Sequence, residues 1–190
     1  MVTRFAFVDE VAAARDLVMT SAGPHVCRLE PRDSTRFAWT CDLDDGTPTS
    51  NENDPASSVR WLSPTFRVPR HGAVTGPAPL DVRRQGPHSD LGRLVARFGR
   101  LVGLGPDDHA GELVWTDPSG ILDADLRHRA EHWPLAPHGD GVVRPAELRS
   151  LRVDGVGLVV DSASWWDSAA ALDHQIGLAL DVAERLLDAT

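Results

Sequence analysis

The sequence contains no lysine and no tyrosine, so all 19 of its basic residues are arginine. Without lysine the chain cannot form a P-loop phosphate site, a Schiff base or a kinase-type ATP site, each of which uses a lysine amine. Without tyrosine it has no tyrosyl acid or nucleophile. Cys27 and Cys41 are its only cysteines, too few for a disulfide framework. With no apolar leader segment near the N-terminus, these absences favour a cytoplasmic protein.

Long apolar runs and an excess of positive charge are also missing. No stretch approaches the roughly 18 apolar residues that a membrane-spanning helix needs, so no membrane partner is expected. The chain has 28 acidic residues against 19 arginines and a net charge of −9. This balance argues against nucleic-acid binding, because polyanions are repelled on average. The 190 residues, 42% of them hydrophobic, suit one domain with a sizeable core.

The apolar residues that are present follow the periodicities of helices and hairpins. The run 5–8 is predicted to be an edge strand, and hairpins are predicted over 25–41 and 151–160. This pattern predicts an α+β fold, a mainly antiparallel sheet with about four amphipathic helices packed on one face. The helices are expected over residues 9–21, 89–102 and 123–133 and from about residue 168 onward.

Two segments lack a clear periodic signal. The polar segment 44–58 is predicted to be a long flexible loop, either mobile or a lid. Residues 59–84 contain short extended pieces interrupted by prolines, which exclude a central strand for most of the segment because proline cannot donate to a strand ladder. In the hairpin 151–160, Asp154 and Gly155 predict a two-residue turn that puts the flanking apolar residues on one face.

The most metal-like feature is a pair of histidines, His128 and His132, four residues apart on a predicted helix. Two such imidazoles share a face and can bind one Zn²⁺ if His138 or Asp140 supplies a further ligand. Both histidines lie opposite the apolar stripe of their helix. The favoured interpretation is therefore a solvated pair, with no metal bound.

Two further candidates have ordinary structural explanations. His25 and Cys27 are two residues apart in one predicted strand and share a face, which allows a catalytic dyad. Buried free cysteines that act as small apolar residues are much commoner. The acidic group Asp117, Asp123 and Asp125 misses the spacing of a calcium loop, and two of its members are interpreted as helix-capping residues.

Arginines recur at helical spacing at Arg93, Arg97 and Arg100, shortly after Arg83 and Arg84. In an acidic protein such a cluster can bind a phosphate, a carboxylate substrate or an acidic partner surface. The favoured interpretation is a solvated face paired with nearby carboxylates, and the binding role stays the alternative.

Trp165 and Trp166 are adjacent, so in an extended segment they point to opposite faces. One of them is expected at the surface or in a pocket, where exposed aromatic residues often mark binding sites. With the loop 44–58, this pair is the predicted functional surface.

Two classes of function fit these features. The first is a non-enzymatic acidic binding protein that captures a basic protein partner, as bacterial immunity proteins and inhibitors of similar size and charge do. The second is a small cofactor-independent enzyme of biosynthesis, resembling a cyclase or isomerase, with a Trp-lined apolar pocket for a small apolar ligand. No cofactor is predicted in either case. The acid–base or positioning residues of the enzyme would be His25, His128, His132, Asp140 and Arg97.

Overall fold

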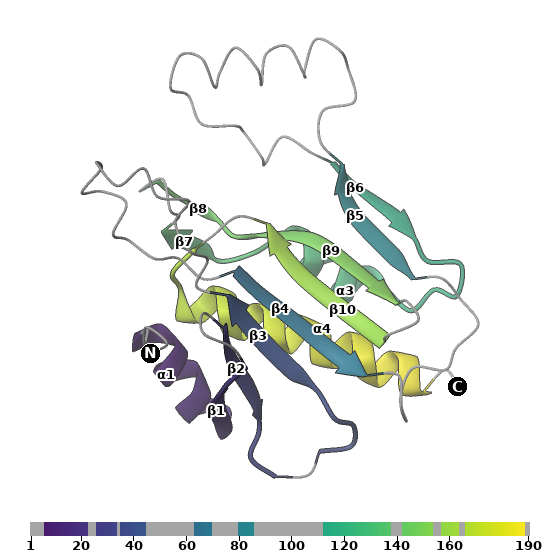
Figure 1. Ribbon diagram of the computed structural model, residues 1–190. Coiled ribbons are helices and arrows are strands. Elements are labelled where there is room, and N and C mark those ends of the chain that lie inside the picture. Colours follow the sequence, from purple (N-terminus) through teal and green to yellow (C-terminus); the bar gives the residue numbers. More distant parts are fainter. Residues whose placement is uncertain are drawn as a thin grey trace.

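The computed structural model describes residues 6–22, 26–33, 35–44, 63–69, 80–85, 112–137, 142–153, 157–163 and 166–188. These residues form an α+β fold in which helices cover one face of an antiparallel sheet (Figure 1). Three helices lie in this part of the chain, where about four were predicted for the whole. The helix predicted over 89–102 and nearly all of the loop predicted over 44–58 fall outside it. None of the described helices is both long enough and apolar enough to cross a membrane.

The sheet has eight strands, and each neighbouring pair is antiparallel. They are β1 (Leu17–Ser21), β2 (Val26–Pro31), β3 (Thr40–Asp44), β4 (Ser63–Pro69), β5 (Asp81–Gln85), β6 (Glu112–Thr116), β9 (Glu147–Val153) and β10 (Gly157–Ala163). Across the sheet their order is β1-β2-β3-β4-β10-β9-β5-β6. A separate two-stranded ribbon pairs β7 (Leu135–Pro137) with β8 (Val143–Pro145).

The helix layer consists of α1 (Ala6–Ala14), α3 (Ala124–Glu131) and α4 (Ala169–Asp188) in the described residues. The long helix α4 packs against β4 and β10 and is flanked by α1 and α3 (Figure 1). Its buried stripe includes Leu172, Ile176 and Ala179, as the periodicity predicts. The buried Gln175 amide donates to the carbonyl oxygen of Val160 at 3.0 Å, which joins α4 to the middle of the sheet.

Side-chain caps mark where the last two helices begin. Asp123 accepts a hydrogen bond from the backbone N–H of Leu126 at 3.0 Å, and its pKa is lowered chiefly by this bond. Asp117 accepts from the N–H groups of Ile121 and Leu122. At α4, the Ser168 hydroxyl accepts from the N–H of Ala171. Asp123 is thus the N-terminal cap of α3, in agreement with the capping interpretation, whereas Asp117 holds the loop that precedes this helix.

The N-terminal prediction is wrong in two respects. The run 5–8 is not an edge strand, because the helix α1 already begins at Ala6. The same helix ends at Ala14 instead of continuing to residue 21, and Leu17–Ser21 forms β1. The chain reverses at Asp16, which has a positive φ of 51°, a conformation that aspartate tolerates better than most residues. Pairing with β2 then satisfies the backbone groups of the following residues.

The exclusion of a central strand between residues 59 and 84 is also wrong. β4 lies in the interior of the sheet, between β3 and β10. Within the strand register, Pro64 is paired only with β3 and Pro69 only with β10. Each proline therefore lies at a position where β4 pairs with only one neighbouring strand. The N–H group that proline lacks would face the unpaired side, so the sheet loses no hydrogen bond there.

The final hairpin is confirmed with a change of register. Val153 pairs with Leu158 and Leu151 with Val160, so the connection is longer than the predicted two-residue turn. The shift amounts to two residues, which leaves the described side chains of the two strands on their predicted face. Leu151, Leu158 and Val160 are accordingly fully buried.

A β-bulge near the start of β9 matters for the surface described below. Leu148 pairs with Ser162, whereas Ser150 pairs with Asp161, so Arg149 is an extra residue in β9 with no partner residue in β10. A bulge changes the direction of the side chains around it. Here it puts the exposed Arg149 and the buried Ser150 next to each other beside β10.

Candidate functional site

Several residues predicted to be functional lie outside the described part of the chain. The remaining ones, His128, His132 and Trp166, have defined positions. Those outside the described residues are His25, His138, Asp140, Trp165, Arg93, Arg97 and Arg100.

His128 of α3 and His132, the residue at the C-terminal cap of this helix, are both exposed, as predicted. Their rings stack with centroids 4.0 Å apart, and the Nδ1 of His132 donates to the carbonyl oxygen of His128 at 2.9 Å. This bond commits one ring nitrogen to the backbone. Within the described ranges no three histidine, cysteine or acidic side chains form a group that could hold a metal ion.

Trp166 is fully buried in the hydrophobic core. Its indole Nε1 is also buried and has no hydrogen-bond partner among the described residues. Trp166 therefore offers no exposed surface to a partner, and this half of the tryptophan prediction needs correction. A surface role for Trp165 stays a prediction.

Cys27 and Cys41 are free and buried, with Cys41 fully enclosed. Burial raises the pKa of the Cys41 thiol strongly, and the neighbouring charge of Asp42 raises it further. A thiol in this state stays protonated at neutral pH, which makes it a poor nucleophile. Both side chains behave as small apolar core residues.

An acidic cleft of about 210 Å³ lies between α3 and α4 on the outer side of the helix layer. It is lined by the carboxylates of Asp125, Asp181, Glu184 and Asp188, the guanidinium groups of Arg129 and Arg185, and Leu126. We call this surface the acidic cleft.

Ion pairs neutralise only part of the acidic cleft. Arg129 pairs with Asp181 across the two helices, and Arg185 reaches Asp123 at 2.6 Å. In contrast, Asp125 and Glu184 are exposed and form no ion pair with any described residue. Two solvated carboxylates are thus available on one surface.

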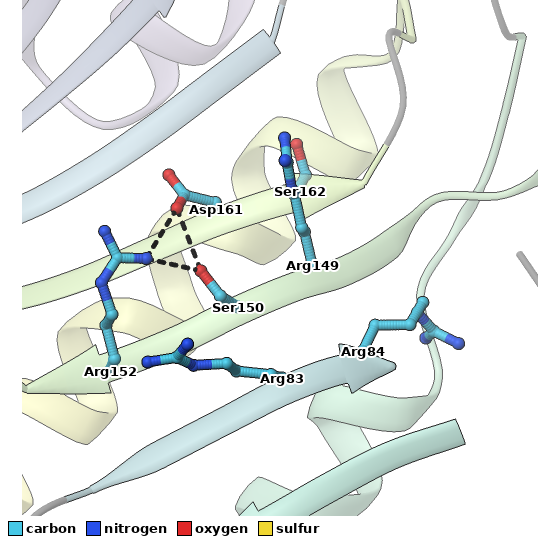
Figure 2. Close-up of a pocket in the computed structure, with 7 residues that line it drawn as sticks. All are labelled: Arg83, Arg84, Arg149, Ser150, Arg152, Asp161 and Ser162. Atoms are coloured by element: carbon cyan, nitrogen blue, oxygen red, sulfur yellow. Dashed lines mark hydrogen bonds and ion pairs between the residues drawn. The ribbon is translucent and has the colours of Figure 1, made fainter. Parts of the chain in front are cut away.

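The second charged surface is a cavity of about 530 Å³ on the face of the sheet opposite the helices. Figure 2 shows its lining residues on three neighbouring strands, with the helices behind the sheet and the Arg84 side chain directed away from the others. We call it the arginine cavity. It is lined by Arg83 and Arg84 of β5, by Arg149, Ser150 and Arg152 of β9, and by Asp161 and Ser162 of β10.

Strand alternation explains why the arginine cavity is polar. Val82, Leu151 and Val160 point into the core and are fully buried. Their neighbours Arg83, Arg152 and Asp161 therefore point to the other face. β5 lies beside β9, with Arg83 opposite Ser150, so arginines far apart in the sequence share one surface.

Most of the donors in the arginine cavity already have partners. Arg83 binds Asp81 at 2.7 Å, and Arg84 binds Glu147 at 3.1 Å. Arg152 contacts both the Ser150 hydroxyl at 3.0 Å and the Asp161 carboxylate at 3.4 Å. These contacts hold the lining in place.

One exposed donor of the arginine cavity is unused. Arg149 forms no hydrogen bond or ion pair with any residue that the structure describes. The Ser162 hydroxyl also lacks a partner in the described residues, but it is enclosed, because Ser162 pairs with the fully buried Leu148 and shares the core face of β10 with Val160.

The sequence reasoning missed both surfaces for a specific reason. It grouped Arg83 and Arg84 with the arginines at 93–100, whereas the sheet joins them to Arg149 and Arg152. The spacing of Arg149 and Arg152 carries a signal only if the bulge in β9 is known. For the acidic cleft, the pairing of α3 with α4 had to be known first.

Comparison with known proteins gives no match. No family model, no curated protein sequence and no solved structure resembles the chain. The class of protein is therefore described by its fold and surfaces: an α+β protein with an acidic cleft in its helix layer and an arginine cavity on its sheet.

Proposed function

We propose that this chain is a non-enzymatic binding protein that captures a basic protein partner through the acidic cleft. The observation that carries the proposal is the pair Asp125 and Glu184, exposed on facing helices and without an ion-pair partner among the described residues. Such carboxylates are free to pair with lysine or arginine side chains of another protein. The surface is supported by the packing of α3 against α4.

The charge of the whole chain fits the same function. A net charge of −9 attracts a basic surface over a distance and raises the rate of encounter. Each exposed ion pair adds little affinity by itself, so the partner must contact several carboxylates of the cleft. We keep the cytoplasm as the proposed compartment, since Cys27 and Cys41 are unpaired thiols.

The enzyme alternative has less support among the described residues. It requires a Trp-lined apolar pocket, but Trp39, Trp133 and Trp166 are buried in the core and Trp115 is half-buried against it. The two cavities described above are lined almost entirely by charged and hydroxyl side chains. The alternative stays a prediction, since Trp61 and Trp165 lie outside the described residues.

The proposal predicts selective binding of a basic probe. We expect a fluorescent deca-lysine peptide to bind the wild-type protein in fluorescence anisotropy. The double variant Asp125→Asn/Glu184→Gln should bind it about three- to tenfold more weakly, because two exposed ion pairs are lost. Both substitutions keep the size of the side chain, so the fold should not change.

A matched control separates the cleft from the overall charge. Glu10→Gln/Glu112→Gln removes the same two charges from exposed positions on α1 and β6. This variant should bind deca-lysine nearly as well as the wild type. Equal losses in the two double variants would show that the peptide senses only net charge, and the proposal would then be wrong.

A further inference from the structure

The arginine cavity differs from the rest of this acidic protein. The guanidinium groups of Arg83, Arg149 and Arg152 gather there with the single carboxylate of Asp161, whereas the Arg84 side chain is directed away from them (Figure 2). Including Asp81, the ion-pair partner of Arg83, still leaves one positive charge without a counter-charge, that of Arg149. An anion is the natural complement of such a surface.

The donors of the arginine cavity also fit an anion. Arg149 offers a planar fork of N–H groups that can bind two oxygens of one ligand. Arg83 of β5 lines the same cavity and brings a second exposed guanidinium group to it.

We propose that the arginine cavity is a binding site for the phosphoryl group of a small molecule, held by Arg149 and Arg83. A phosphoryl group carries more charge and more acceptor oxygens than a carboxylate, which matches a site with several cationic donors. Arg83 can turn to the ligand, because its side chain is 61% exposed and its ion pair with Asp81 is solvated.

The size of the arginine cavity sets the size of the ligand. Its volume of about 530 Å³ is in the range of small-molecule sites. The ligand therefore carries more than a lone phosphate ion. Because this cavity and the acidic cleft lie on opposite faces of the protein, the proposal does not depend on the function proposed above.

Inorganic pyrophosphate is a suitable probe, with citrate as a carboxylate of similar charge. We expect isothermal titration calorimetry to show pyrophosphate binding to the wild-type protein and weaker binding of citrate at equal ionic strength. Arg149→Gln should weaken pyrophosphate binding about tenfold, since a charge-assisted contact is lost. Arg149→Lys keeps the charge but not the planar fork of N–H groups. Its affinity for pyrophosphate should therefore lie between those of the wild type and Arg149→Gln.

Two further variants test whether these losses are specific. Arg32→Gln removes an exposed arginine at the far edge of the sheet and should leave pyrophosphate binding within about twofold of the wild type. Ser162→Ala removes a hydroxyl that is enclosed on the core face of β10, so it should also leave pyrophosphate binding within about twofold of the wild type. Its melting temperature should be equal or higher, because no described residue bonds to this hydroxyl.

The proposal would be overturned by any of three results. The first is absence of pyrophosphate binding at millimolar concentration. The second is an equal loss in Arg149→Gln and Arg32→Gln, which would show a general effect of charge. The third is tighter binding of citrate than of pyrophosphate, which would assign the cavity to carboxylates.

Discussion

At the residue scale, His174 is the titratable side chain whose environment most directly predicts a measurable effect. It is half-buried on α4, and its Nε2 donates to the carbonyl oxygen of Arg129 at 2.8 Å. Its ring contacts that of Trp133, with centroids 5.0 Å apart. Burial lowers the pKa of His174, and the charge of Arg129 lowers it further, against the opposing hydrogen bond and Asp173.

The lowered pKa of His174 predicts a loss of stability in mild acid. The unfolded protein binds a proton at the ordinary histidine pKa of 6.5, whereas the folded protein resists protonation until the pH is lower. The free energy of unfolding should therefore fall as the pH drops through 6.5 toward the folded-state pKa, and it should be fully retained above 6.5.

Denaturant unfolding between about pH 7.5 and about pH 5 tests this prediction, since most carboxylates stay ionised over that range. His174→Gln should make the free energy of unfolding less dependent on pH over this range, whatever its effect on stability at pH 7.5. His132→Gln, which changes an exposed histidine of α3, should keep the wild-type slope. An unchanged slope in His174→Gln would rule out His174 as the group responsible.

At the scale of single elements, α4 holds a glycine in its interior that two arginines approach. A Cβ atom on Gly177 would lie 3.2 Å from a terminal nitrogen of Arg15 and 3.4 Å from one of Arg129. These guanidinium groups pair with Asp173 and Asp181 on the same helix. Both are ends of flexible side chains, so they can move by the few tenths of an ångström that a methyl group needs.

Gly177→Ala is therefore expected to stabilise the protein. Alanine is favoured over glycine inside a helix by about 1 kcal/mol, and the shift of the two ion pairs should offset only part of this gain. We expect the free energy of unfolding to rise by about 0.5 kcal/mol in urea titrations. Gly177→Val should show no such gain, because its branched side chain crowds the arginines and lowers helix propensity. A clear loss in Gly177→Ala would show that the arginines are held rigidly.

The elements that the sequence predicts well are those in which several local signals agree. In the last hairpin and α4, alternation, cap and apolar stripe all indicate the same structure, and the buried faces were predicted even though the turn was longer. The start of the chain failed because the apolar spacing of 9–21 suits a helix throughout, whereas pairing with β2 decides the outcome. β4 failed because a proline near a strand end is harmless when only one neighbour is present there.

At the scale of the whole molecule, the candidate sites depend on contacts between distant segments. The acidic cleft joins residues near 125 to residues near 184, and the arginine cavity joins β5 to the last hairpin. Neither group of lining residues can be predicted from local periodicity. The composition could therefore predict an acidic binding protein, but not which residues form its binding surface. Among the described residues, the helix layer thus carries carboxylates without an ion-pair partner, and the sheet carries one guanidinium group without a partner.

This arrangement predicts that salt and the cleft variants act on different rate constants. Long-range attraction depends on the net charge of −9, whereas the bound state depends on contacts in the acidic cleft. Screening shortens the reach of charges from about 30 Å at 10 mM salt to about 8 Å at 150 mM. In stopped-flow measurements with labelled deca-lysine, this change should slow association about tenfold and alter dissociation much less.

The two double variants extend this prediction to the protein itself. Asp125→Asn/Glu184→Gln and Glu10→Gln/Glu112→Gln each remove two negative charges, so both should slow association by a similar, small factor. Faster dissociation should occur only in the first, because only there are contacts of the bound peptide removed. If salt left the association rate unchanged, the net charge would play no part in capture. If the peptide dissociated equally fast from both variants, it would not be bound at the acidic cleft.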